Sequence, residues 1–174
     1  MESPSDGVVQ RTNPVSPVVA IEDHTTNTID ITWTIDEDTV YDSFEIFYKA
    51  DSDEDYQTDT IDGEDPHEYQ LKDLTPGEKY KIEMKTHSGG ETSDSSEPKQ
   101  QRTKPVSPVV AIEDHTTNTI DITWTIDEDT VYDSFEIFYK ADSDEDYQTD
   151  TIDGEDPHEY QLKDLTPGEK YKLK

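Results

Sequence analysis

Apolar and polar residues alternate one by one along several short segments of this chain. In the segment 28–34, Ile29, Ile31 and Trp33 face one side and the residues between them are polar. A period of two with β-branched residues predicts a strand that is buried on one face. We expect six further strands, the last of which is weak on its own: residues 18–21, 43–49, 56–61, 68–72, 78–85 and 99–103. Short strands separated by turn signals at intervals of roughly 8–12 residues predict an all-β protein, an antiparallel sandwich of two sheets.

The same pattern occurs twice. Residues 14–81 recur letter for letter as residues 105–172, which is 68 identical residues at an offset of 91. Because one core cannot use the same residues twice, the repeat predicts tandem domains. We therefore expect a complete domain at 14–104 and an incomplete one at 105–174. The second copy is truncated in its sixth strand and lacks the seventh, and residues 1–13 align with the last strand of a preceding copy.

Several motifs in each repeat resemble a known family. Pro14-Val15-Ser16-Pro17, Trp33 on the second strand, the Tyr48 strand and the run Leu74–Tyr80 (LTPGEKY) are similar to the fibronectin type III domain. The resemblance implies a seven-stranded immunoglobulin-like sandwich, with strands A, B and E on one sheet and C, C′, F and G on the other. It also assigns structural roles to Trp33, Leu74, Pro76, Gly77 and Tyr80, and in the second copy to Trp124, Leu165, Pro167, Gly168 and Tyr171.

In that assignment Leu74 fills the core, Pro76 and Gly77 make a turn, and the Tyr80 hydroxyl bonds back across the corner as in a tyrosine corner. The segments YDSFEIFYK, DLTPGEKY, SGGETS and QRT-x-P are similar, more narrowly, to repeats in the ectodomains of receptor-type tyrosine phosphatases. No phosphatase domain lies in these 174 residues, so the resemblance brings no catalytic residue with it.

The net charge of the chain disfavours some classes of binding partner. The chain has 44 acidic and 14 basic residues, a net charge of −30, and no cysteine. Such a charge with few aliphatic residues is typical of disordered chains, but the strand pattern and the ten tyrosines favour a folded one. Nucleic acid and anionic membrane surfaces would repel the chain, so we expect neither as a partner. Without cysteine the chain has no disulfide, thiol chemistry or Cys-based metal site.

Two acidic segments are the candidates for binding. Asp51, Asp53 and Asp55 begin like a calcium loop, and so do Asp142, Asp144 and Asp146 in the second copy. An EF-hand needs Gly at position 6 and Glu at position 12, and the first copy has Tyr56 and Asp62 there. The pattern therefore favours a solvated acidic hairpin, with weak association of divalent cations as the alternative.

The other candidate is the loop Asp62-Gly63-Glu64-Asp65. It resembles the acidic loops by which some fibronectin and tenascin repeats contact integrins, and a polar turn is the alternative. We identified no catalytic residue and no cofactor site, so we do not expect an enzyme.

These observations predict a non-enzymatic adhesion, recognition or spacer module of a cell-surface or receptor protein, in contact with a protein ligand whose identity the residues do not reveal. An intracellular structural array and an acidic cation-binding module are the alternatives. We expect an extracellular location within a longer membrane protein whose signal peptide and membrane segment lie elsewhere. The charge favours a monomer. The alternative is intermolecular strand exchange, in which the N-terminal residues of one molecule add to the exposed sixth strand of another.

Overall fold

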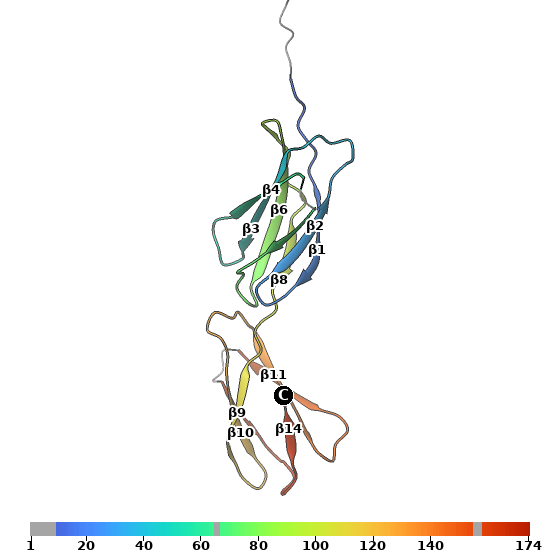
Figure 1. Ribbon diagram of the computed structural model, residues 1–174. Coiled ribbons are helices and arrows are strands. Elements are labelled where there is room, and N and C mark those ends of the chain that lie inside the picture. Colours follow the sequence, from blue (N-terminus) through green and yellow to red (C-terminus); the bar gives the residue numbers. More distant parts are fainter. Residues whose placement is uncertain (1–9, 65–66, 155–157) are drawn as a thin grey trace, which may run out of the picture. The chain divides into compact units, whose positions relative to one another are not determined.

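The computed structural model describes residues 10–64, 67–154 and 158–174 (Figure 1). The chain divides into two compact units, of which the first is made mainly of residues up to Lys104 and the second mainly of residues from Pro105 onwards, and each unit is described by itself. Both are built from antiparallel strands, and the described residues contain no helix that could span a membrane. The all-β fold predicted from the alternating pattern is therefore confirmed.

Unit 1 consists of two facing sheets. One sheet has the order β1-β2-β5, and the other has the order β4-β3-β6-β7 with β8 also paired to β6. The strands are β1 (Val18–His24), β2 (Ile29–Thr34), β3 (Ser43–Ala50), β4 (Gln57–Asp62), β5 (Glu68–Leu71), β6 (Lys79–Ser88), β7 (Glu91–Thr92) and β8 (Lys99–Arg102). All seven predicted segments are strands, and β7 is an additional short one.

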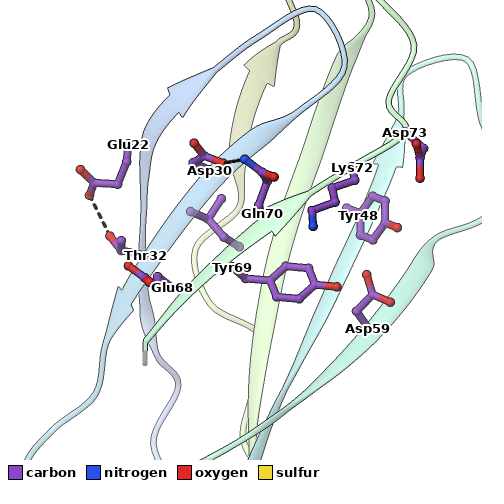
Figure 2. Close-up of a pocket in the computed structure, with 11 residues that line it drawn as sticks. Glu22, Asp30, Thr32, Tyr48, Asp59, Glu68, Tyr69, Gln70, Lys72 and Asp73 are labelled. Atoms are coloured by element: carbon purple, nitrogen blue, oxygen red, sulfur yellow. Dashed lines mark hydrogen bonds between the residues drawn. The ribbon is translucent and has the colours of Figure 1, made fainter. Parts of the chain in front are cut away.

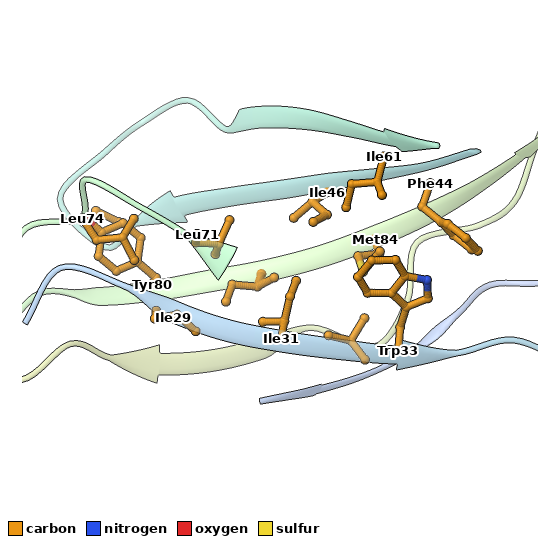
Figure 3. Packing of buried hydrophobic residues seen from close by; sticks show 13 residues of the cluster. Ile29, Ile31, Trp33, Phe44, Ile46, Ile61, Leu71, Leu74, Tyr80 and Met84 are labelled. Carbon is orange, nitrogen blue, oxygen red and sulfur yellow. The ribbon is translucent and has the colours of Figure 1, made fainter. Parts of the chain in front are cut away.

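The core of unit 1 lies between the two sheets. Figure 3 shows Ile29, Ile31 and Trp33 projecting from β2 towards residues of the other sheet. These three side chains are at most 2% exposed, as the alternation predicted. Trp33 meets the Phe44 ring edge-on at 5.3 Å between centroids, and Met84 lies in the same cluster.

Two buried serines join the segment between β7 and β8 to β6. The N–H of Ser93 donates to the Thr86 carbonyl (2.9 Å), and the N–H of Thr86 donates back to the Ser93 hydroxyl (2.9 Å). Ser96 and Met84 make the same reciprocal pair at 2.8 and 3.0 Å. Hydroxyl oxygens thus replace strand carbonyls here, and the buried N–H groups of β6 stay satisfied.

Unit 2 repeats the first six strands of this arrangement. Its sheets have the orders β13-β10-β9 and β12-β11-β14. The strands are β9 (Val109–His115), β10 (Ile120–Thr125), β11 (Ser134–Ala141), β12 (Gln148–Asp153), β13 (Glu159–Leu162) and β14 (Tyr171–Leu173). The described part of unit 2 has no counterpart of β7 or β8. As a result Val110 is 44% exposed, whereas the equivalent Val19, on a strand that contacts β8, is 3% exposed.

Of the N-terminal segment predicted to be a remnant strand, residues 1–9 lie outside the described residues. Residues 10–13 form no strand. The Arg11 guanidinium donates instead to the Ser88 hydroxyl at 3.0 Å.

Candidate functional site

A groove follows the edge strand β5 in unit 1 and the equivalent β13 in unit 2. Its volume is about 730 Å³ in the first unit and about 800 Å³ in the second. Figure 2 shows the first groove, where Tyr69 of β5 projects towards Asp59 of β4, with Tyr48 of β3 nearby. The equivalent residues of unit 2, Tyr139, Asp150 and Tyr160, line the second groove.

The strand pattern explains why an acidic side chain reaches the space between the sheets. In β4 every second residue faces inward, and Ile61, which is 6% exposed, fills one of these positions. Asp59 is two residues earlier, opposite Ile46 of β3, and therefore points the same way. Tyr69 comes from the facing sheet, where it pairs with Ile31. An inward carboxylate on one edge strand thus meets a phenol from the other sheet.

The tyrosine hydroxyls at this point are held in their neutral form. Burial raises the pKa of Tyr48, and the negative charge of Asp59 raises it further. Burial also raises the pKa of Tyr69, followed by the hydrogen bond with Asp59. Both phenols are therefore hydrogen-bond donors at neutral pH.

The same electrostatics recur in unit 2. The Tyr160 hydroxyl donates to Asp150 Oδ2 at 3.2 Å. Burial, and then Asp150, raise the pKa of Tyr139 and Tyr160. In both units a carboxylate is held by phenols, and its negative charge is not cancelled by a cation among these contacts.

The outer side of the groove is acidic. Glu22 accepts a hydrogen bond from Thr32 (2.8 Å), and Asp30 accepts one from the Gln70 amide (2.7 Å), as the dashed lines in Figure 2 show. The groove of unit 1 is lined by five carboxylates and one ammonium group, which belong to Glu22, Asp30, Asp59, Glu68, Asp73 and Lys72. The groove of unit 2 is lined by Glu113, Asp121, Asp150, Glu159 and Lys163. A cationic partner would therefore be attracted to either groove.

One edge of β5 is free within the described part of the chain, because β5 pairs only with β2. The backbone N–H of Trp33 donates to the His67 carbonyl (3.1 Å), so Trp33 and His67 form a hydrogen-bonded pair of the ladder. Hydrogen-bonded and non-hydrogen-bonded pairs alternate along an antiparallel ladder. The N–H and C=O groups of Glu68 and Gln70 therefore point away from β2, towards the free edge.

The predicted cation loop is organised around a lysine. Lys49 Nζ donates to the carbonyls of Asp53 and Glu54 at 3.2 and 3.3 Å, and lies 5.4 Å from the centroid of the Tyr56 ring. Asp51 is instead 3.9 Å from Lys79. Among the described residues no three acidic or histidine side chains gather as metal ligands, so the structure does not bring Asp51, Asp53 and Asp55 together as a cation site.

The hairpin of unit 2 repeats this arrangement. Lys140 Nζ donates to the carbonyls of Asp144 and Glu145 at 3.3 and 3.0 Å. Asp142 forms an ion pair with Lys172 at 3.0 Å, and that hydrogen bond lowers the pKa of Asp142. Asp146 is exposed.

The loop predicted to contact a protein forms a turn. The Gly63 N–H donates to the Asp42 carbonyl (2.9 Å), and the Glu64 N–H donates to Asp62 Oδ1 (3.1 Å). A Cβ on Gly63 would lie 2.8 Å from the Asp42 oxygen, so the turn needs glycine there. Asp65 lies outside the described residues, and a role of this loop in binding stays a prediction.

The residues assigned structural roles lie in or beside the cores. Trp33 and Trp124 are 2% and 4% exposed, and Leu74, Leu165 and Tyr80 are also buried. In unit 2 the Tyr171 hydroxyl accepts the Thr166 N–H at 3.0 Å, as in a tyrosine corner. Gly77 and Gly168, which follow Pro76 and Pro167, have φ of 74° and 78°, a conformation that favours glycine.

Sequence reasoning did not single out Tyr48, Asp59 and Tyr69 as a group. The available signal was the inward position of Asp59, two residues before Ile61 in a strand of period two.

Comparisons with known proteins agree with this architecture. The family model of the fibronectin type III domain matches residues 13–102 and 104–174. A segment of two fibronectin type III domains from chicken tenascin has a similar structure, with a TM-score of 0.64 and 22% identity over 90% of this chain and 87% of that one. A structure titled "Myokine structure" has a TM-score of 0.50 and 22% identity over 53% of this chain and 99% of that one. No curated protein matches the chain. The chain belongs to the fibronectin type III family, with two domains in tandem.

Proposed function

We propose that this chain is a non-enzymatic module that recognises other proteins and spaces domains within an extracellular adhesion protein. The observation that carries the proposal is the groove, which both domains build from equivalent residues, with Asp73 as an additional lining residue in unit 1. Each groove lies at the surface where two sheet edges meet, and the space between the sheets is filled by the domain's own side chains. Binding therefore takes place on strand edges and exposed side chains.

The fold similarity to a tandem segment of tenascin supports a role within an array of such domains. The narrower setting that we propose is the ectodomain of a cell-surface receptor, in line with the resemblance of several motifs to receptor-type tyrosine phosphatases. The net charge of −30 supports the same setting, because it keeps a module soluble when many copies are held near one another.

The proposal is tested by the binding of the fluorescently labelled chain to a panel of intact cells. We expect saturable binding that disappears when surface proteins are removed from the cells by protease. A variant with Glu68→Lys and Glu159→Lys, which reverses one exposed charge in each groove, should bind more weakly. The matched control is Glu54→Lys with Glu145→Lys, which makes the same charge change in the two exposed hairpins.

Absence of binding to every cell type, or binding that survives protease treatment of the cells, would contradict the proposal. Equal loss in both double variants would contradict the assignment of the groove as the contact surface, because a change in net charge alone would then explain the result.

A further inference from the structure

We infer that the groove binds an extended, lysine- or arginine-rich segment of a partner protein, which adds to the free edge of β5 as a further strand, and to β13 in unit 2. This inference rests on the proposed function and specifies the chemistry of the partner.

The backbone of β5 presents hydrogen-bonding groups along its free edge. The N–H and C=O groups of Glu68 and Gln70 face the free edge, and among the described residues β5 has a pairing partner on its other side only. An extended peptide that meets such an edge forms main-chain hydrogen bonds, and its alternate side chains fall on opposite faces of the sheet. β5 is four residues long, so the added segment is short.

The two faces of the added strand would meet different chemistry. On the outer face lie Glu68, Asp30 and Glu22, all of which line the groove. On the inner side lie the rings of Tyr69 and Tyr48. A segment with cationic residues at every second position therefore fits, because its charges reach the carboxylates while the residues between them contact the tyrosines.

The tyrosine rings can also accept a cation on their faces. The chain already contains this arrangement, since Lys49 Nζ lies 5.4 Å and Lys81 Nζ lies 5.7 Å from the centroid of the Tyr56 ring. Such contacts contribute about 0.5–1 kcal/mol at exposed sites. A lysine or arginine of the partner that turns inward would thus still be accommodated.

Charge also selects against other occupants. A second copy of this chain carries the same acidic edge and a net charge of −30, so two β5 edges repel each other. The inward carboxylate of Asp59 lies on β4, the edge strand of the facing sheet, and opposes the pairing of apolar strands with that edge. The occupant that remains is a cationic strand from another protein.

The test uses the full chain and a capped synthetic peptide of about nine residues in which lysine and valine alternate, matching the two faces of an added strand. Calorimetric titration should give two peptides bound per chain, one for each groove. Upon binding, hydrogen exchange at the backbone N–H groups of Glu68 and Gln70 should slow, because they become hydrogen-bonded.

Two comparisons separate strand addition from attraction by net charge. A peptide of the same sequence in which every backbone nitrogen is methylated keeps its charge but loses its main-chain donors, and should bind at least about tenfold more weakly. The Glu68→Lys/Glu159→Lys variant should weaken binding by a similar factor, whereas Glu54→Lys/Glu145→Lys should change it by no more than about twofold. The circular dichroism spectrum of each variant verifies that it is folded.

Equal binding of the methylated peptide, equal weakening in both double variants, or no binding of the lysine–valine peptide would overturn the inference. If the chain binds cells but not the peptide, the proposed function stands and the partner has a different chemistry. Peptide binding without any cell binding would contradict the proposed function and leave the groove chemistry in place.

Discussion

The two domains allow the effect of packing on stability to be compared within one chain, because β1 and β9 have the same seven residues in different surroundings. Val19 is 3% exposed and Val110 is 44% exposed. The difference follows from β8, which lies beside β1 and has no counterpart in the described part of unit 2. Replacing each valine by alanine therefore removes the same atoms from a covered and from an open site.

The expected effects can be estimated from the buried fraction. Valine to alanine removes two methyl groups, and burial stabilises by about 0.8 kcal/mol for each such group. Val19→Ala should therefore lower the free energy of unfolding of unit 1 by about 1.5–2.5 kcal/mol, including the cavity that remains in a closed core. Val110→Ala should lower that of unit 2 by about 1 kcal/mol or less, since little more than half of the side chain is buried and the open site leaves no cavity.

Fluorine NMR of the 5-fluorotryptophan-labelled chain measures both units in one sample. The chain has two tryptophans, Trp33 in the core of unit 1 and Trp124 in the core of unit 2, so each signal reports on its own domain. Urea titration should move the midpoint of the Trp33 signal in Val19→Ala and leave the Trp124 signal in place. Val18→Ala and Val109→Ala are the controls, because these residues are 68% and 71% exposed and each change should cost no more than about 0.5 kcal/mol. Equal losses from Val19→Ala and Val110→Ala would refute the reasoning that β8 covers this strand.

Three further predictions concern charge. Asp59→Asn should lower the raised pKa of Tyr48 and Tyr69, while the equivalent tyrosines of unit 2 stay unchanged in a carbon-13 titration of the phenol rings. Because these folded-state pKa values are raised, the wild-type contribution to stability is complete below about pH 10 and is lost as the pH rises through them, so the variant should lose less stability at alkaline pH. Raising the ionic strength from about 10 mM to 150 mM shortens the Debye length from about 30 to 8 Å and should raise the melting temperature, and an unchanged melt would contradict a role of self-repulsion. In analytical ultracentrifugation we expect a monomer with or without residues 1–12, and a larger species that needs these residues would favour intermolecular strand exchange instead.

Alternation along the chain was enough to predict the core-facing side chains. Ile29, Ile31 and Trp33 occupy every second position of β2 and are all buried, because a strand covered on one face must place its apolar residues there. Polar strands are harder to predict by this means. The segment KQQR of β8 has no apolar residue and so no alternation, and it pairs with Lys79–Ile82 of β6.

The groove could be predicted only in part for a related reason. Tyr48, Asp59 and Tyr69 come from three strands, and a period of two assigns each side chain to a face without stating which strands form the edges of the sheets. The reciprocal pairs of Ser93 with Thr86 and of Ser96 with Met84 could not be predicted either. They depend on a departure from regular strand geometry, and an isolated serine has no periodic signal.

The inward carboxylate of Asp59 has a consequence for how a chain of identical repeats folds. During synthesis, β4 of a newly made domain and its copy β12 are tethered at high effective concentration, and each could pair with the wrong sheet. A mispaired strand would bury Asp59 or Asp150 without its tyrosine donors, and an unpaired buried charge is strongly unfavourable. In each unit a tyrosine of β5 or β13 reaches the carboxylate. The residue therefore opposes the addition of β4 or β12 to a sheet that lacks these tyrosines, whereas a strand exchanged between the two domains would meet the same tyrosines, because 68 residues are identical.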